Sequence, residues 1–570
     1  MPRDGVASTV LGRASAGIVA VDLDASGTET GRAELGSGDI ADWVARHEAD
    51  HSPRWVWSDT PGWYRTVLDA GVRVARCHEL RSTHIVLEGS MLARSGGYDP
   101  GDASWGRALP ATHAGDTLFE VDDPSGPPTG IQSALTAYAR QRAAIARSTD
   151  PGRLRLLTAA ESAGTLVAVE MTAAGVPWDA EHHDRILSET LGARPTAGAL
   201  PTRMRDAADR VREALGDGAV SLDSAPKLVR ALNRAGVFVD TTSRWELAEH
   251  DHPVIAPLLA YKRMSRLLTA NGWNWLDHWV SDGRFRPLYV PAGVVTGRWA
   301  SSGGGALQIP RQLRSAVRAD AGWTFVLADV AQLEPRALAA MSRDEALADA
   351  ARGTDLYSGV VVRGAASTRA DAKVAMLGAM YGATTGEAGR LVVPLRRTFP
   401  VAMRLVDDAA RVGEDGGVVT TWLGRSSPPP DDRWRHLQAR ASEQGASASD
   451  VERARRAARD QGRFTRNFIV QGTAAEWAAV WLAEIRRRLD AMADADLTSE
   501  ATASGRAFAR RPHLAFFLHD EVIVHTPESQ AEQVAEIVRE SAAAATEALF
   551  GDFPLDFPLD LKIARSAEKS

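Results

Sequence analysis

The segment HLAFFLHDEVIVH, near the C-terminus, places three polar side chains inside an apolar run. Residues 514–525 have the composition of a buried strand, yet His519, Asp520 and Glu521 follow one another in its middle. A buried carboxylate is costly unless a cation or hydrogen bonds compensate its charge. The pattern therefore predicts one strand over residues 514–525 whose two carboxylates have a compensating partner.

A second apolar segment, TFVLADV, ends in a carboxylate at Asp329 and is followed by Gln332 and Glu334. If Asp329 and Asp520 meet, their oxygens would suit Mg²⁺, which accepts one or two protein carboxylates together with substrate phosphates. Two such ions, about 3.5–4 Å apart, can stabilise the attacking and leaving oxygens of a phosphoryl displacement. The alternative is that each aspartate caps a turn at the end of its strand.

A stripe of four side chains recurs at every fourth position in STRADAKVAMLGAMYG: Arg369, Lys373, Leu377 and Tyr381. This spacing predicts a helix that presents all four on one face. Two cations followed by an aromatic ring suit a triphosphate and its base, and Lys373 is one of only five lysines in the chain. The alternative is an amphipathic helix that begins with solvated basic residues.

A second stripe at the same spacing consists of Arg463, Asn467 and Gln471, within GRFTRNFIVQGTAAEWAAV. These side chains can contact phosphates, sugars and base edges, so the stripe is a candidate nucleic-acid contact. Thr296, Gly297 and Arg298 precede a glycine-rich loop, which on its own is weak evidence of a binding site.

The elements that must position these side chains belong to a chain of 570 residues, too long for one hydrophobic core. A net charge of −7 argues against a strongly basic nucleic-acid binder, although an enzyme needs positive charge only along its channel. The single cysteine, Cys77, excludes an intramolecular disulfide and a cysteine-rich zinc site. Because no apolar run reaches ~20 residues and no signal-peptide pattern is found, we expect a cytoplasmic protein.

Element types change along the chain. The first 90 or so residues have an α/β pattern, with a strand at IVAVDLD that carries Asp22 and Asp24. The breaker cluster at residues 150–152 predicts a domain boundary. Helical spacing dominates from about 154 to 270, strands return near RFRPLYVPAG and TFVLADV, and helices dominate again to about residue 490.

Taken in order, these segments resemble the polymerase domain of family A DNA polymerases, the bacterial DNA polymerase I type. The resemblance runs from about residue 161 to about residue 565. Five motifs match: Thr296-Gly297-Arg298; Asp329 to Arg336; Arg369 with Lys373, Gly378, Tyr381 and Gly382; Gln471 to Ala475, followed by Glu476; and His519-Asp520-Glu521.

The resemblance implies an α/β and α+β multidomain fold. A ribonuclease H-like, 3′–5′ exonuclease-type domain would span residues 1–150, and a right-hand polymerase domain residues 151–570. Within the latter, the helical thumb would occupy about 161–270, the helical fingers about 331–462, and the antiparallel palm sheet about 271–330 and 463–570.

The resemblance also implies a DNA-templated DNA polymerase that extends a primer 3′ end in replication or repair. Its cofactor would be a pair of Mg²⁺ ions, for which Mn²⁺ could substitute. Its partners would be primer-template DNA and deoxynucleoside triphosphates, with no membrane. A monomer in the bacterial cytoplasm, associated with the nucleoid, is expected.

The resemblance assigns a role to individual residues. The implied catalytic residues are Asp329, Asp520, Glu521 and Lys373, and the implied metal ligands are Asp329, Asp520 and the carbonyl of Val330. The implied nucleotide contacts are Arg369, Lys373, Leu377, Tyr381, Gln332 and Glu334, and the implied DNA contacts are Arg298, Arg463, Asn467, Gln471 and His519.

Two features depart from the family pattern. Leu377 replaces the usual Phe or Tyr, which leaves nucleotide selectivity and rate open. In the N-terminal region, Asp22 and Asp24 form a shortened first nuclease motif, a second acid is missing, and Arg142 replaces another. We expect a vestigial exonuclease without activity, because the loss of carboxylates weakens metal binding. A DNA-binding scaffold with attenuated catalysis, and a polymerase with residual 3′–5′ exonuclease activity, are the alternatives.

Overall fold

The computed structural model divides into two compact units. The larger unit comprises residues 1–174, 288–302 and 321–564, and the smaller comprises 175–287, 303–320 and 565–570. The residues that the structure describes are 5–15, 17–36, 38–107, 126–196, 199–305, 309–353, 355–382, 386–495 and 500–568. A helix does begin at Pro151, but residues 1–174 stay within one unit, and the domain limits given above stay predictions.

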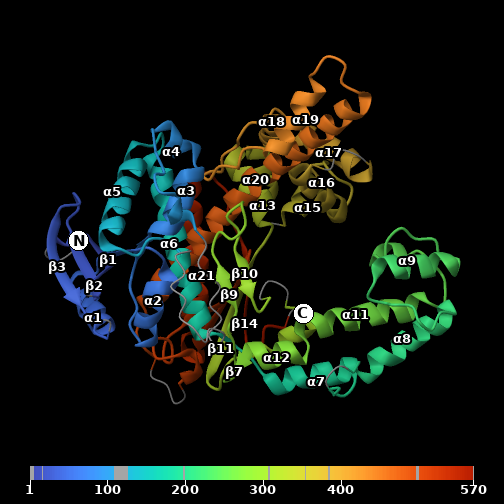
Figure 1. Ribbon diagram of the computed structural model, residues 1–570, viewed down its shortest axis with the longest axis horizontal. Coiled ribbons are helices and arrows are strands. Elements are labelled where there is room, and N and C mark those ends of the chain that lie inside the picture. The colour runs from blue at the N-terminus through green and yellow to red at the C-terminus, as the bar shows by residue number, and fades with distance from the viewer. Residues whose placement is uncertain are drawn as a thin grey trace. The chain divides into compact units, whose positions relative to one another are not determined.

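The larger unit begins with a five-stranded sheet in the strand order β3-β2-β1-β4-β5. Figure 1 labels three of its strands, β1, β2 and β3, near the N-terminus. Its strands are β1 (Ser8–Ala14), β2 (Gly17–Leu23), β3 (Glu29–Leu35), β4 (Arg54–Trp57) and β5 (Cys77–Glu79). β1 is antiparallel to β2 but parallel to β4, and β4 is parallel to β5, so β1, β4 and β5 end at the same edge. The strand predicted at IVAVDLD is β2, and the expected α/β layer is confirmed.

Helices pack around this sheet and lead out of it. They are α1 (Ile40–His51), α2 (Thr60–Asp69), α3 (Leu80–Gly89), α4 (Met91–Ser95), η2 (Ala103–Gly106) and α5 (Ile131–Arg147). The core under β4, which holds the buried Trp55 and Trp57, also contains Leu166 and Val169 of the next helix, α6 (Pro151–Ala174). The N-terminal layer therefore shares its core with α6.

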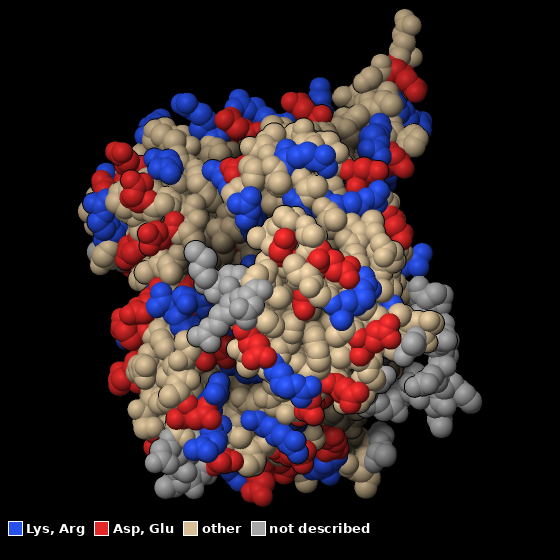
Figure 2. Space-filling view, turned by 90° about the vertical axis from the view of Figure 1, so that its left-hand side faces the viewer, with Lys and Arg blue, Asp and Glu red and all other residues tan. Residues whose placement is uncertain are grey.

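On the face shown in Figure 2, acidic and basic side chains of the described residues are interspersed.

A four-stranded antiparallel sheet forms the centre of the larger unit, in the order β12-β13-β11-β14. Its strands are β11 (Trp323–Val330), β12 (His513–Leu518), β13 (Glu521–Pro527) and β14 (Leu559–Ala564). The helices α20 (Ala448–Asp490) and α21 (Ala531–Phe550) belong to the same unit, as does the short pair β9 (Leu288–Val290) and β10 (Ala300–Gly303). The antiparallel sheet expected for a palm is confirmed, and β11 is the strand predicted at TFVLADV.

The single strand predicted over residues 514–525 is wrong. The segment folds as a hairpin, in which Leu518 pairs with Glu521 while His519 and Asp520 form the turn between β12 and β13. His519 has a φ of +56°, and the N–H of Asp520 donates to the carbonyl of Leu518 at 2.6 Å. Such a tight turn, with a positive φ at a residue other than glycine, is strained. The polar residues therefore lie at the tip of the sheet and not in its middle.

The remaining helices of the larger unit are α13 (Leu333–Ser342), α14 (Glu345–Ala351), α15 (Leu356–Val362), α16 (Arg369–Tyr381), α17 (Gly386–Thr398), α18 (Pro400–Glu414), α19 (Asp432–Ala441), η5 (Thr502–Ser504) and η6 (Glu528–Gln530). The helix predicted for the first stripe is α16, which runs from Arg369 to Tyr381. The second stripe lies on α20, a helix of 43 residues that begins with a capping box between Ser447 and Asp450.

The smaller unit is mainly helical, as predicted for this part of the chain. It contains α7 (Ala180–Leu191), α8 (Thr202–Leu215), α9 (Ala225–Arg234), α10 (Arg244–Ala248), α11 (Ile255–Asn271), α12 (Trp273–Trp279), η4 (Arg311–Ala316), and the strands β6 (Val176–Pro177), β7 (Val280–Ser281) and β8 (Arg284–Phe285). Apolar faces of α8, α9 and α11 form one of its cores. Among the helices described in both units, none is long and apolar enough to span a membrane.

A buried charge network joins the N-terminal layer to α6 and α20. Glu170 of α6 forms ion pairs with Arg73 (3.1 Å) and with Arg486 of α20 (2.7 Å). Tyr64 donates a hydrogen bond to Glu170, and Arg486 also donates to the backbone carbonyls of residues 74–75. Burial alone would raise the pKa of Glu170, but the two guanidinium groups outweigh it and bring the pKa to about 2.

Replacement of Glu170 by Gln should lower the free energy of unfolding at pH 7 by about 3–5 kcal/mol, because the buried Arg486 loses the carboxylate with which it pairs and Arg73 keeps only Asp490. Urea unfolding at pH 7 measures this change. Glu29→Gln is the control, since Glu29 forms an exposed pair with Arg32 and its replacement should leave the unfolding free energy nearly unchanged.

The loss of stability in Glu170→Gln should depend on pH. A carboxyl group whose pKa is lowered on folding stabilises the protein above its unfolded pKa, about 4.3, and this stabilisation is lost as the pH falls toward the folded value. The difference in unfolding free energy between wild type and Glu170→Gln should therefore narrow from about pH 5 toward pH 2. A difference that grows as the pH falls over this interval would contradict a lowered pKa for Glu170 in the folded protein.

Candidate active site

The sheet register brings the two predicted carboxylates to one place. Asp329, next to the end of β11, lies opposite Glu521, the first residue of β13. The N–H of Val330 donates to the carbonyl of Asp520 at 2.9 Å, so the tip of the hairpin is fastened to the end of β11. Glu521 is buried, whereas Asp329 and Asp520 are half-buried. Asp329, Val330, Asp520 and Glu521 therefore form one cluster.

The carboxyl groups of this cluster repel one another. The pKa of Asp520 is raised to about 6, first because the group is buried and second because the charge of Asp329 is close. Mutual repulsion of this kind in a half-buried site favours either a shared proton or a bound cation. The arrangement is thus electrostatically suited to a positive ion.

The donor atoms of the cluster are all oxygens, which suits a hard divalent cation such as Mg²⁺. No group of three or more His, Cys, Asp or Glu side chains able to hold a metal occurs within the described parts of the chain. A metal at Asp329 and Asp520 would therefore need further oxygens, such as a backbone carbonyl and substrate phosphates. The residues present fit an ion that arrives with its substrate.

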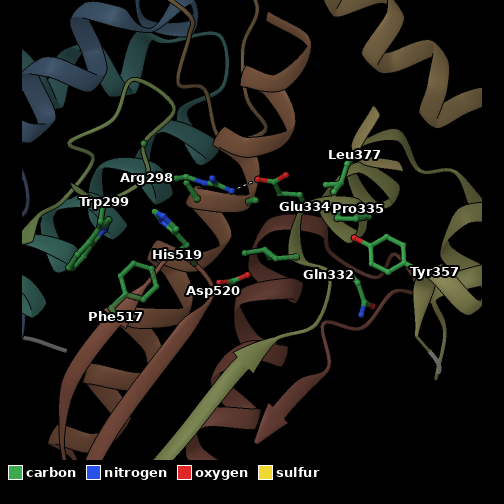
Figure 3. Close-up of a pocket in the computed structure, with 15 residues that line it drawn as sticks. Arg298, Trp299, Gln332, Glu334, Pro335, Tyr357, Leu377, Phe517, His519 and Asp520 are labelled. Carbon is green, nitrogen blue, oxygen red and sulfur yellow. Dashed lines mark hydrogen bonds and ion pairs between the residues drawn. The ribbon is translucent and has the colours of Figure 1, made fainter. Parts of the chain in front are cut away.

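A pocket lies directly beside this cluster, and Figure 3 shows Asp520 below a pair of side chains that point toward each other, Arg298 and Glu334. Arg298 forms an ion pair and a hydrogen bond with Glu334. The hydroxyl of Tyr381, from the end of α16, donates to the other carboxylate oxygen of Glu334 at 2.8 Å. Glu334 is only 8% exposed, so its carboxylate is held in place from two sides.

Apolar and aromatic groups line the rest of the pocket. Leu377 of α16 and Tyr357 of α15 stand on one side, and Trp299 and Phe517 meet edge to face on the other, with ring centroids 5.1 Å apart. His519 also lines the pocket, and burial, together with the charge of Arg298, lowers its pKa. A neutral imidazole at this position can accept as well as donate a hydrogen bond.

The two cations of the first stripe differ in their surroundings. Arg369 forms a bidentate ion pair with Asp355, at 3.0 Å from Nε and 2.8 Å from Nη2. Lys373 is exposed one turn further along α16. Gln332, predicted as a nucleotide contact, donates to Asp355 at 2.9 Å and accepts from the N–H of Leu356 at 3.3 Å. Its side chain thus holds the start of α15 in this structure.

The second stripe runs along α20 toward the pocket. Gln471 accepts a hydrogen bond from Thr296 at 2.8 Å, which ties the Thr-Gly-Arg segment to the helix. Arg463 is exposed and pairs with Asp460. The side-chain oxygen of Asn467 is buried without a hydrogen-bond partner among the described residues. A buried amide oxygen without a partner is costly, so this position favours a bound donor.

The two acids suggested as a vestigial nuclease motif, Asp22 and Asp24, each have local partners. Asp22 is on β2 opposite Thr9, which donates to it at 2.7 Å, and His47 contacts the same oxygen at 3.0 Å. Asp24 accepts from three backbone N–H groups of residues 26–28 and so caps a turn. Because β2 is antiparallel to β1, both acids lie at the edge opposite the carboxyl ends of β1, β4 and β5.

The shared carboxyl edge of β1, β4 and β5 holds other groups. The guanidinium of Arg13 lies over the ring of Trp63, 5.5 Å from its centroid. Asp59 and Glu79 each accept a hydrogen bond from a backbone N–H at the start of α2, at 2.7 Å in both cases. Carboxyl ends of parallel strands are where α/β sheets place their ligands. Here the acids of that edge cap a helix.

Asp355 and Tyr357 were not singled out from the sequence, although both contact predicted site residues. Asp355 precedes α15 and also caps it, by accepting from the N–H of Ser358. An N-cap signal, GTDLYSG, is present in the sequence and could have marked the start of the helix. No local pattern indicates that its carboxylate reaches Arg369, which is 14 residues away.

Comparison with known proteins shows which proteins this chain is similar to. The family model described as DNA polymerase family A matches residues 223–568, more than half of the chain. DNA polymerase I of Chloroflexus aurantiacus is 28% identical over 351 residues, which are 57% of this chain and 33% of that protein. The thermostable DNA polymerase I of Thermus aquaticus is 26% identical over 349 residues, or 56% of this chain and 36% of that protein. The chain thus spans about a third of the length of these curated relatives.

A solved structure has the same fold. The POL domain of Pol1 from M. smegmatis, in complex with DNA primer-template and dNTP, aligns with a TM-score of 0.61 and 18% identity, over 96% of this chain and 92% of that one. At this identity the likeness concerns the fold alone. The family model, in contrast, matches residues 223–568, which are more than half of the chain. This chain therefore belongs to DNA polymerase family A.

Proposed function

We propose that this chain is a DNA-templated DNA polymerase that adds deoxynucleotides to the 3′ end of a primer. The observation that carries the proposal is the meeting of Asp329 and Asp520 at the tip of the central sheet, beside a pocket flanked by Arg298 and Glu334. Family membership supports it. The partners would be primer-template DNA and deoxynucleoside triphosphates, as in the complex of the M. smegmatis domain.

Members of family A use divalent metal ions, and we propose Mg²⁺, replaceable by Mn²⁺, for this chain. When bound, a pair of such ions activates the primer 3′-hydroxyl and stabilises the charge that develops on the phosphates. Asp329, Asp520 and the carbonyl of Val330 would hold the ions, and Glu521 would support them from its buried position. The carboxylate repulsion described above is the structural feature that favours this assignment.

The other side chains would bind and orient the reactants. Arg369 and Lys373 would hold the triphosphate, with Lys373 acting in catalysis next to the phosphates that react. Glu334 would pack against the sugar, and Leu377 would replace the usual flat ring. The implied contacts to primer and template are Arg298, Arg463, Asn467, Gln471 and His519, and the unpartnered oxygen of Asn467 supports one of them. A monomeric state and a cytoplasmic, nucleoid-associated location stay predictions.

We further propose that residues 1–150 do not proofread. The acids at the carboxyl edge of β1, β4 and β5 cap α2, and Arg13 with Trp63 occupies the same edge. Asp22 and Asp24 lie at the other edge and have local partners. A two-metal nuclease centre needs several free carboxylates together, and these residues do not supply them.

The first test is primer extension with Mg²⁺ and four deoxynucleotides. Asp520→Ala and Asp329→Ala should each lower the extension rate about a hundredfold or more, because each removes one of two metal-holding carboxylates. Asp552→Ala, at an exposed aspartate, serves as the control and should extend normally. Absence of extension by wild type at high enzyme concentration would favour a DNA-binding scaffold over a polymerase.

The second test concerns the sugar of the nucleotide. Glu334→Ala should raise the use of ribonucleotides relative to deoxynucleotides by about tenfold to a hundredfold, because the variant opens space where a 2′-hydroxyl would lie. The ratio of the two kcat/KM values measures this selectivity. Glu345→Ala, at an exposed glutamate of α14, should leave the ratio unchanged. An unaltered ratio in Glu334→Ala would show that Glu334 does not select against the 2′-hydroxyl.

The third test asks whether the N-terminal layer cleaves DNA. Wild type and Asp22→Ala should both leave 3′-labelled single-stranded DNA intact over the time in which wild type completes extension. Degradation that persists in Asp329→Ala but disappears in Asp22→Ala would show that a nuclease centre has survived, and would overturn this part of the proposal.

A further inference from the structure

Asp355 connects three elements around the pocket. Its side chain caps α15 through the N–H of Ser358 at 2.8 Å, accepts from Gln332 at 2.9 Å, and binds the guanidinium of Arg369 through both of its oxygens. Gln332 lies at the start of α13, and Arg369 is the first residue of α16. One carboxylate thus joins the beginnings of α13, α15 and α16.

The pair of Asp355 and Arg369 contacts two residues that line the pocket, Gln332 and Tyr357. Tyr357, two residues after Asp355, lines the pocket, and the guanidinium of Arg369 lies 5.6 Å from the centroid of its ring. Lys373 follows one turn later on α16 and has no ion-pair partner within the part of the chain that the structure describes. Of the two cations in the stripe, one is therefore engaged by a carboxylate and one is available.

The contact on Arg369 is of the kind that a phosphate would make. A planar guanidinium binds a carboxylate or a phosphate through the same two parallel N–H groups, so one anion excludes the other from that edge. The side chain of Arg369 is 59% exposed and that of Asp355 is 27% exposed. An ion pair so open to water is weak enough to be exchanged for a more highly charged anion.

We propose that Asp355 is a positioning residue for the incoming nucleotide: it holds Arg369 while no nucleotide is bound and yields the guanidinium to the triphosphate. The inference rests on the proposed function, since it assumes that Arg369 binds the triphosphate. Asp355 thereby weakens nucleotide binding, because its carboxylate competes for the guanidinium and adds a negative charge near the phosphates.

The isosteric change Asp355→Asn tests this role. Asn caps a helix about as well as Asp, so α15 should keep its start, while the bidentate contact with Arg369 is lost. The KM for deoxynucleoside triphosphate in primer extension should fall by about threefold to tenfold, with little change in kcat. A purely structural role would not lower KM.

Two further variants test whether the change in KM depends on the pair of Asp355 and Arg369. In an Arg369→Ala background, Asp355→Asn should no longer lower KM, because the competing partner is gone. Asp349→Asn is the matched control, since Asp349 is an aspartate of the same unit that also pairs with arginine side chains, Arg352 and Arg363, and is 43% exposed. It should leave KM unchanged in either background.

The alternatives give different results. A KM that rises in Asp355→Asn would mean that the carboxylate presents Arg369 to the triphosphate, and an unchanged KM would reduce Asp355 to a helix cap; either result overturns the proposal. Calorimetric binding of dATP with Mg²⁺ to the protein alone keeps this test separate from the proposed function. Tighter binding by Asp355→Asn would support the role of Asp355 even if wild type extended no primer.

Discussion

The close approach of Asp329 and Asp520 is the interaction around which the larger unit is arranged. Two carboxylates in a half-buried site oppose each other, and the pKa of Asp520 is raised first by burial and second by the charge of Asp329. They stay together because backbone hydrogen bonds fix their positions: β11 is paired on both sides, and Val330 is fastened to the hairpin tip. A rigid sheet thus holds a repulsive pair that a cation can relieve.

Helices on separate parts of the chain complete the surroundings of this pair. Tyr381 reaches Glu334 from the last residue of α16, and Gln471 reaches Thr296 from the middle of α20. Each contact joins segments that are tens to hundreds of residues apart. The pocket therefore depends on the same long-range packing that holds the helices against the central sheet.

Local patterns in the sequence predicted the elements well and their partners poorly. The apolar run that ends in Asp329 identified β11, and the four-residue spacing from Arg369 to Tyr381 identified α16. Periodicity reports which face of an element is buried, so it can locate a stripe but not the group opposite it. The ion pair between Arg369 and Asp355 arises from tertiary structure, and so does the antiparallel direction of β2, which places Asp22 at the edge opposite the carboxyl ends of β1, β4 and β5.

The hairpin was also missed for a physical reason. Apolar runs on both sides of His519 and Asp520 look like one buried strand, because a two-residue turn leaves the alternation almost undisturbed. The roles given to nucleotide and DNA contacts rested on family motifs, and these stay predictions until they are measured. Periodicity could not predict the strained turn that positions Asp520.

The network around Glu170 has a consequence for the history of the N-terminal layer. Arg486 of α20 donates to backbone carbonyls of residues 74–75, and Arg73 and Tyr64 bind the same glutamate. A deletion of residues 1–150 would leave Arg486 paired with Glu170, but it would remove Arg73, Tyr64 and the carbonyls that accept from Arg486, and it would open the core shared with α6. Selection on stability alone can therefore retain this layer in descendants, even where it catalyses nothing.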